Sequence, residues 1–598
     1  MSDPTLDPSS VPVAVTKAKS QPPPERPENV RTRSLIILSF WAVVVLLGLP
    51  IWWKTTTIYR AKLPLQEMMD WADGRACRPV FPLQISVEAP ELQEQEAQHL
   101  LQLTQHALDD LNDFTAHHLR LHLSHSKRNE SSPEAATDPS LQTASAPVPP
   151  DTEADVAMVL RLVPGETGSS PSISLQALSP RLDVAYPPNQ IPSSSSTSST
   201  LAAFIAGTLR DMFAEEQAMM AHILSPTASG SGNVPPSNSI AAPQMPQPSG
   251  QSASGGWEVR TPSRSLPSDL AANLARRTTR SVKYAPTYHL TFSLFTPSAT
   301  PSSWEIESAL EQNIIPLLES LSVISNFTVD TQVQVYATFS PSIRQPQYDA
   351  EIGSWTLSKE DLSGFINAAE WPLSPSIGGA PTVNFILYVP AKETAPLVIK
   401  ENQGNSWLIP QWGGVFILNS PHDPTAQTPD ILSIESLRNP LRTFSHQLLS
   451  LLGTPQSPPS LPLRLSTLTR VRSASLLFSA SSTLGSLARL TLALQSISIP
   501  RSVANAVDKT IAHLHNACAD LREGQFHKAL QNGRIAEAEA ERGFFEKSMV
   551  GQVYFPDEHK VAVYLPLLGP VGVPLVIGLL KEVRRMLKDW KRRRAGGV

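Results

Sequence analysis

The chain has 598 residues, too many for one compact domain, and carries a net charge of -5 with only 17% charged residues. This balance does not indicate nucleic-acid binding, and the two cysteines, Cys77 and Cys518, exclude a disulfide-rich scaffold and a Cys-rich zinc site. A Cys77–Cys518 bridge is possible in an oxidising lumen, but the sequence does not decide it. The alternative is that Cys518 is a small buried residue of a helix.

The N-terminal part contains the first of two long apolar runs. Residues 1–33 are polar and Pro-rich, which predicts a disordered tail. Residues 34–53 carry no charge and are long enough to cross a bilayer as a helix. A cleaved signal peptide is the competing interpretation. We reject it because the run is too long and Trp52, Trp53 and Lys54 stand where small residues would precede a cleavage site.

The second apolar run, residues 561–580, is also uncharged and of spanning length. Basic residues follow it in a dense cluster: Lys581, Arg584, Arg585, Lys588, Lys591, Arg592, Arg593 and Arg594. Because loops rich in Lys and Arg stay on the cytoplasmic side, we predict a cytoplasmic tail over 581–598. Two spans then place both termini in the cytoplasm and residues 54–560 in a lumen.

The lumenal region begins with an expected α/β part, over about residues 80–433. Helical spacing and alternation predict helices over 88–126, 201–224 and 304–321 (with a kink at Pro316), and strands over 155–163, 172–178, 288–295, 327–339, 383–389 and 414–418. Residues 127–152 and 225–268 are rich in Ser and Pro and are expected to be disordered linkers. These elements predict an α/β domain with a mixed β-sheet.

The C-terminal part of the lumenal region, about residues 434–550, is expected to be mainly helical. Periodic leucines and Ala/Glu-rich stretches predict helices over 437–452, 465–497 and 503–549. The predicted fold class is therefore an α/β lumenal domain plus a mainly helical C-terminal part, flanked by two transmembrane helices.

Two groups of residues invite a catalytic or metal-binding interpretation. His513, His515 and Cys518 could supply a Cys/His nucleophile, since His515 and Cys518 would share a helical face. No glycine-rich turn precedes Cys518 to form an oxyanion hole, so we favour ordinary helix residues. His118, His122 and His125 would share a face of the first helix, next to His117. No local carboxylate or cysteine completes a metal site, so a solvated face is the favoured interpretation.

Common catalytic motifs are missing from the sequence. It contains no Asp-x-Asp pair, no GxxxxGK[ST] phosphate loop and no Gly-x-Ser-x-Gly elbow. We therefore predict no catalytic, cofactor-binding or metal-binding residue and no cofactor.

Two other features carry predictions about individual residues. The sequons at Asn129 and Asn326 lie in the predicted lumenal region, so both are expected to be glycosylated. Pro566, Pro570 and Pro574 recur every four residues in the second span, with small glycines between them. A kinked anchor is the plain interpretation. The alternative is a face that packs against helices of other membrane subunits.

A series of short matches runs along almost the whole chain and resembles one known family. The matches are GLPIWWKTT (48–56), YHLTFSL (288–294), NFTVDTQ (326–332), NFILYVP (384–390), Trp412-Gly-Gly, Phe444 with Gln447, and Phe555-Pro-Asp. In this order, and with two flanking spans, they are similar to the PIG-S subunits of the glycosylphosphatidylinositol (GPI) transamidase. The linkers 127–152 and 225–268 look like insertions in that pattern.

The resemblance implies a non-catalytic structural subunit of a complex in the endoplasmic reticulum membrane that attaches preformed GPI anchors to the C-terminus of precursor proteins. It implies that the Cys/His nucleophile belongs to a caspase-like partner subunit. It also implies contact with membrane lipid, an indirect encounter with precursor proteins, and no nucleic acid. The alternatives are a stand-alone lumenal glycosyltransferase and a lumenal binding or chaperone module.

Overall fold

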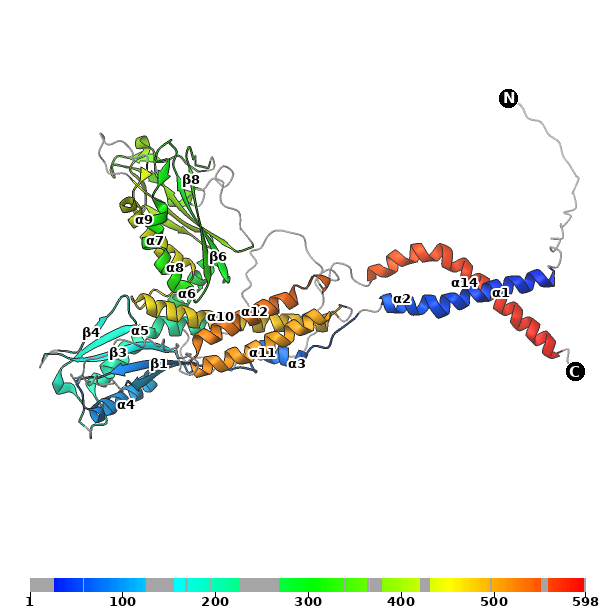
Figure 1. Cartoon of the computed structure of the whole chain (residues 1–598), viewed down its shortest axis with the longest axis horizontal. Coiled ribbons are helices and arrows are strands. Elements are labelled where there is room, and N and C mark those ends of the chain that lie inside the picture. The colour runs from blue at the N-terminus through cyan, green and yellow to red at the C-terminus, as the bar shows by residue number, and fades with distance from the viewer. Residues whose placement is uncertain are drawn as a thin grey trace, which may run out of the picture. The chain divides into compact units, whose positions relative to one another are not determined.

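The computed structural model describes residues 26–56, 59–124, 155–166, 170–193, 195–224, 268–337, 339–340, 343–362, 365, 379–419, 431–494, 497–549 and 558–595. The chain divides into two units (Figure 1). One contains both ends of the chain and residues 494–500, and the other contains residues 62–493 and 501–546. The predicted linkers 127–152 and 225–268 fall almost wholly outside the described residues.

The unit that contains both chain ends is built on two long helical segments. The first runs through α1 (Pro27–Val43), a π-helical segment (Val44–Gly48) and α2 (Leu49–Thr56), so helix begins at Pro27, before the predicted start at residue 34. The second is α14 (Glu558–Ala595), which stays helical through its three prolines and continues past residue 580. One helix of spanning length and composition, Glu28–Gly48, is found among the described residues.

The larger unit begins with α3 (Leu65–Ala72) and a five-stranded sheet in the order β2-β1-β3-β5-β4. Its strands are β1 (Phe81–Glu88), β2 (His117–Leu123), β3 (Val156–Pro164), β4 (Ser172–Leu175) and β5 (Arg181–Tyr186), with only β4 antiparallel. Alternating buried and half-buried residues along β1 direct Leu83, Ile85 and Val87 into the core. Helices α4 (Glu94–Leu111) and α5 (Thr200–Leu224) complete this part.

A second five-stranded sheet, in the order β13-β14-β11-β6-β8, follows helix α6 (Ser268–Arg280). Its strands are β6 (Thr287–Phe295), β8 (Asn326–Gln334), β11 (Thr382–Tyr388), β13 (Ser406–Ile409) and β14 (Gly413–Ile417), and only β13 is antiparallel. β6 and β11 are buried on both faces, as expected of central parallel strands. One face packs against α7 (Ile306–Asn313), α8 (Ile315–Leu321) and α9 (Ile434–Leu451) (Figure 1).

The other face of the second sheet has a separate aromatic cluster around Phe365, Tyr388 and Trp407. A small sheet in the order β12-β10-β9 contributes to this cluster, with β9 (Gln347–Asp349), β10 (Ser354–Leu357) and β12 (Leu397–Ile399). A two-stranded pair, β7 (Ser303–Trp304) with β15 (Ile431–Leu432), lies at the start of α7 and α9. Mixed α/β sheets are thus confirmed.

The C-terminal part of this unit is helical, as predicted. It consists of α10 (Leu461–Ala493), α11 (Arg501–Glu523) and α12 (Phe526–Phe544), with α12 packed along α11 and α10 (Figure 1). Gly485 allows α3 to approach α10, because an added Cβ there would lie 2.3 Å from the Cβ of Ala72. A single helix over 503–549 is wrong: Gly524, at φ +76, ends α11 with its N–H bonded to Leu521 O.

Two other helix predictions are wrong. Residues 88–126 form α4 and then β2, because Asn112 caps the turn by accepting the N–H of Phe114 at 3.0 Å, and HHLRLHL alternates as a strand. Residues 304–321 form β7, α7 and α8 rather than one kinked helix. Pro316 has no N–H to give to the carbonyl of Gln312, and the helix breaks at Ile314. The strand expected over 327–339 ends at Gln334.

A buried ion pair joins the first sheet's helix α5 to α10. Glu216 and Arg470 are each 2% exposed, with Arg470 Nε and Nη2 donating to the two carboxylate oxygens at 2.6 Å. The Thr467 hydroxyl donates a third bond at 2.6 Å. Burial alone raises the pKa of Glu216, but the charge and hydrogen bonds of Arg470 outweigh it and hold the pKa well below its usual range. This pair therefore fixes how α5 lies on α10.

We predict that Arg470→Met lowers the free energy of unfolding by about 3–5 kcal/mol, because it leaves the carboxylate of Glu216 buried without its cation. The double variant Glu216→Leu/Arg470→Met should recover most of that loss, since it removes both charges. Thermal unfolding followed by circular dichroism measures the effect. Equal losses in the single and double variants would contradict it.

The same pair predicts a pH dependence. Because the pKa of Glu216 is depressed in the folded chain, its stabilisation is present above the reference pKa of 4.5 and is lost as the pH falls below it. The double variant should therefore lose less stability on acidification than the wild type.

Candidate functional site

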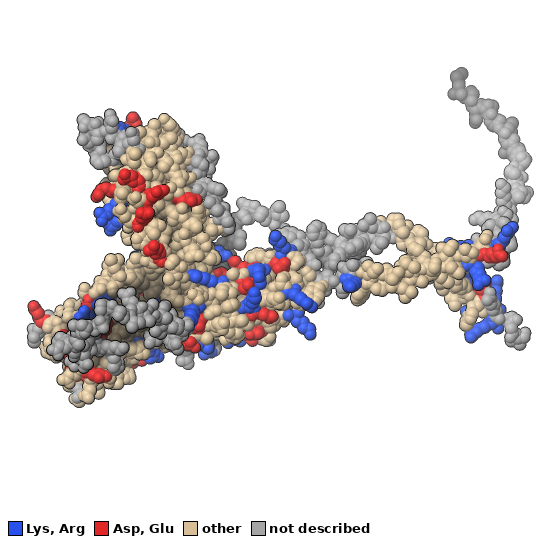
Figure 2. Space-filling model, viewed as in Figure 1, with Lys and Arg blue, Asp and Glu red and all other residues tan. Residues whose placement is uncertain are grey.

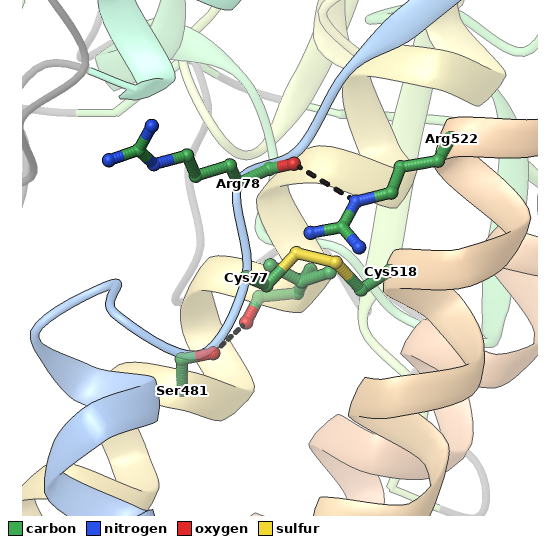
Figure 3. The surroundings of a disulfide bond; sticks show 6 residues. Cys77, Arg78, Ser481, Cys518 and Arg522 are labelled. Atoms are coloured by element: carbon green, nitrogen blue, oxygen red, sulfur yellow. Dashed lines mark hydrogen bonds between the residues drawn. A yellow bond between two sulfur atoms is a disulfide. The ribbon is translucent and has the colours of Figure 1, made fainter.

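A disulfide bond decides whether Cys518 of α11 could act as a nucleophile. Cys518 is bonded to Cys77, with the two Cα atoms 6.3 Å apart, and the two side chains are 4% and 1% exposed (Figure 3). Nearby, Arg522 Nε donates to the carbonyl oxygen of Arg78 at 3.4 Å. A sulfur in this bond is no nucleophile, since nucleophilic attack needs the thiolate. The bond ties the segment before β1 to α11.

The two histidines near Cys518 contact neighbouring helices instead. His515 Nε2 lies 3.2 Å from the carboxylate of Glu67 on α3, and its ring packs edge-on against Trp71 with centroids 5.0 Å apart. His513 Nδ1 lies 2.8 Å from Asn532 Oδ1 on α12. Both therefore hold α11 against its neighbours, as expected of ordinary helix residues.

The histidine group expected on one helical face lies on strand β2. Alternation along the strand places His118 and His122 on one face and His117 on the other, while His125 is outside the described residues. His117 is buried, with Nε2 3.5 Å from Glu216. Burial is the main reason that the pKa of His118 is lowered. Among the described residues, no group of three His, Cys, Asp or Glu could hold a metal ion.

A cluster that the sequence analysis missed lies across strands β6 and β8. His289 is 3% exposed, with Nδ1 2.7 Å from the hydroxyl of Thr328 and Nε2 2.8 Å from the carboxylate of Asp330. Hydroxyl, imidazole and carboxylate stand in the order of a hydrolase triad. The cross-strand pairing of His289 with Thr328 could have indicated it only once the register was known.

The geometry of this cluster favours a structural role. A triad needs backbone donors directed at an oxyanion, but the N–H of Asn326 is given to Pro286 O in the ladder with β6, at 2.9 Å. The imidazole is buried, and its hydrogen bond with Thr328 and its close contact with the carboxylate of Asp330 fasten β8, the edge strand, to β6. We interpret the cluster as a cross-strand clasp.

A cavity of about 710 Å³ lies between α5, α6 and the loop at Gln456 and Ser457. Its arginine Arg277 donates to the carboxylate of Glu215 and, through Nη2, to Thr454 O at 2.9 Å. Glu215 also accepts the backbone N–H of Gln456 at 3.0 Å and of Ser457 at 2.7 Å. The charges of Arg277 and Glu215 are therefore already paired within the chain.

The remaining predicted positions have the following surroundings. Asn326 is exposed at the first residue of β8, whereas Asn129 is outside the described residues. Pro566, Pro570 and Pro574 are exposed along α14, and a Cβ added at Gly569, Gly572 or Gly578 would meet no atom within 4 Å. The proline face is thus uncovered by the described part of the chain.

The two helical segments of the end-containing unit contact each other at Glu582 of α14. Glu582 of α14 is 5% exposed, accepts the hydroxyl of Ser34 and lies 3.7 Å from the guanidinium of Arg33. The start of the first apolar run therefore lies beside the end of the second.

Comparison with known proteins shows the family of this chain. A family model described as phosphatidylinositol-glycan biosynthesis class S protein (PIG-S) matches residues 39–589. The chain belongs to the PIG-S family. It is 27% identical over 583 residues to "GPI-anchor transamidase component PIGS" of Mus musculus, covering 93% of this chain and 96% of that protein.

Other relatives match about half of the chain. The protein of Bos taurus with the same name is 32% identical over 352 residues, which cover 55% of this chain and 62% of that protein. "GPI transamidase component PIG-S homolog" of Schizosaccharomyces pombe is 30% identical over 332 residues, covering 54% and 58%. Membership of PIG-S therefore extends from mammalian to fungal relatives.

The disulfide gives a prediction that separates it from a Cys518 nucleophile. An alkylating reagent added to the unfolded, unreduced chain should label neither cysteine, and labelling should appear at Cys77 and Cys518 after reduction. The variants Cys77→Ser and Cys518→Ser should lose similar stability, about 2–5 kcal/mol each, because both open the same loop. Labelling of Cys518 before reduction, or an effect confined to Cys518→Ser, would overturn the assignment.

Proposed function

We propose that this chain is a non-catalytic structural subunit of the GPI transamidase of the endoplasmic reticulum membrane. The observation that carries the proposal is the match to PIG-S over residues 39–589, with relatives named as components of that complex. The complex joins preformed GPI anchors to the C-terminus of precursor proteins. In this proposal the Cys/His nucleophile lies in a caspase-like partner subunit.

The surroundings of the chemically suggestive residues support a non-catalytic role. Cys518 is held in a disulfide, His513 and His515 join helices, and His289 joins two strands. A stand-alone lumenal glycosyltransferase would need a sugar-nucleotide site, for which the sequence offers no Asp-x-Asp pair. A binding or chaperone module without a fixed complex is the remaining alternative.

We also propose that the chain spans the membrane twice, through residues 34–53 and 561–580, with both termini in the cytoplasm and residues 54–560 in the lumen. The contact of Ser34 and Arg33 with Glu582 supports this, because a hairpin of two spans brings those positions to the same membrane surface. The Cys77–Cys518 disulfide fits an oxidising lumen.

Assembly can be tested by purifying the tagged chain in mild detergent and identifying what comes with it. We expect a stable multi-subunit assembly that contains a cysteine-protease-like subunit. The triple variant Pro566→Leu/Pro570→Leu/Pro574→Leu should lose membrane partners, because it removes the small, exposed face of α14. A matched control, Val571→Leu/Val576→Leu, substitutes exposed residues away from the proline face and should retain them.

Recovery of a lone chain that consumes a sugar nucleotide would overturn the assembly proposal. Unchanged recovery of every partner with the proline variant would overturn the role of that face while leaving membership of the complex intact.

Lumenal placement can be tested through the sequons. Asn326→Gln and Asn129→Gln should each remove one glycan, so each variant should migrate faster in electrophoresis than the wild type. Endoglycosidase treatment of the wild type should also increase its mobility. Thr328→Ala should act like Asn326→Gln, whereas Thr328→Ser preserves the sequon and should keep the glycan. A wild-type chain that endoglycosidase does not change would contradict the lumenal placement of both sites.

A further inference from the structure

Helix α14 continues well beyond the second apolar run. From Leu580 to Ala595 it extends for about 22 Å at the usual rise per residue. Arg584, Lys588, Lys591 and Arg592 are exposed along this extension. Lys588 follows Arg584 by four residues, and Lys591 and Arg592 follow Lys588 by three and four, so all four lie on one broad face of the helix. The basic residues after the span thus form an ordered stripe, which we call the basic face.

An exposed apolar stripe lies beside the basic face. Val583, Leu587 and Trp590 follow one another at helical spacing and are 39%, 51% and 51% exposed. The guanidinium of Arg594 lies 4.1 Å from the centroid of the Trp590 ring. A helix with a basic face beside an exposed apolar stripe that contains tryptophan is typical of helices that contact a membrane surface.

The acids of the extension do not neutralise the basic face. Glu582 is buried against α1, where it accepts the hydroxyl of Ser34 and lies beside Arg33. Asp589 projects from another side of the helix than Arg584, Lys588 and Lys591, and of the basic face only Arg592 lies one turn from it. The contact with α1 also brings the basic start of α1 to this end, and Figure 2 shows Lys and Arg gathered there.

We propose that the basic face binds the headgroups of anionic phospholipids at the membrane surface from which α14 emerges. This proposal rests on the two-span placement proposed above. Arg584 and Lys588 lie about 6 and 12 Å along the axis beyond Leu580. A headgroup layer is about 5–8 Å thick, and charges act over a further 8–10 Å in physiological salt. The basic face therefore lies within reach of an anionic surface, which attracts Lys and Arg next to a span.

A topological signal alone does not account for this arrangement. Retention of a loop on the cytoplasmic side depends on the number of Lys and Arg residues and not on their position around a helix. Here most of the exposed basic residues occupy one face, and the exposed apolar residues, with Arg594 beside Trp590, occupy another. Contact with an anionic membrane surface explains both, because anionic headgroups attract the basic residues and the interface accommodates the apolar ones.

The test uses the purified full-length chain, without partner subunits, in nanodiscs of phosphatidylcholine that contain a minor fraction of phosphatidylserine. The chain is extracted into detergent and the lipids that remain bound are quantified. We expect phosphatidylserine to be enriched over its bulk fraction at low salt and the enrichment to fall at high salt. In the variant Arg584→Gln/Lys588→Gln/Lys591→Gln the enrichment should fall by about tenfold or more.

Two controls make the result specific. Arg438→Gln/Arg442→Gln/Lys400→Gln removes three exposed basic residues of the other unit and should leave the enrichment unchanged. The tail variant retains Lys581, Arg585, Arg592, Arg593 and Arg594, so the positive charge that orients the span persists. Protease accessibility of tags at both ends checks this orientation, and a failure there would overturn the two-span placement itself.

Equal phosphatidylserine enrichment in the wild type and the tail variant, with both oriented correctly, would overturn the proposal. So would loss of a partner subunit from the tail variant in cells without any change of bound lipid in nanodiscs. That second result would show that the basic face binds an acidic surface of a partner protein.

Discussion

Two arginines near the start of α10 connect this helix to both α/β parts of the larger unit. Arg470 pairs with Glu216 of α5, beside the first sheet. Arg472 donates to Leu452 O, at the end of α9, at 2.7 Å, and its guanidinium lies 6.0 Å from the ring of Tyr284, just before β6. The buried charge of Arg470 needs the carboxylate of Glu216, and the half-buried Arg472 binds a carbonyl of α9's C-terminal end, so these positions influence which elements can pack on α10.

The strongly periodic elements were predictable from the sequence, and the breaks between them were not. The apolar run of β11 and the leucines of α9 lie in the core, as their patterns indicate. Strand β1 was missed although it alternates, because it stands next to a longer helical pattern. The end of α11 depends on the positive φ of Gly524, and the fate of Cys518 depends on a residue 441 positions away. Local periodicity contains neither kind of information.

Several of the short matches that indicated the family are residues of the core. Phe444 packs against Phe385 with ring centroids 5.1 Å apart, and Gly414 leaves room for Gln447, whose Oε1 would lie 1.9 Å from an added Cβ. A Cβ at Gly413 would lie 1.8 Å from Asn384 O. These residues permit α9 to pack closely on β14 and β11. The signature therefore specifies a fold, and it could identify the family without indicating any reactive group.

The prolines of α14 show why such a chain would act within an assembly. Each proline leaves the carbonyl four residues earlier without its helical donor, which affects Ala562, Pro566 and Pro570. In lipid a carbonyl without a partner costs several kcal/mol, and the exposed proline face has no cover from the described part of this chain. Donors on neighbouring helices would remove that cost, and the small residues would let those helices approach. If α14 spans the membrane as proposed, it is thus better suited to the interior of a membrane complex than to lipid alone.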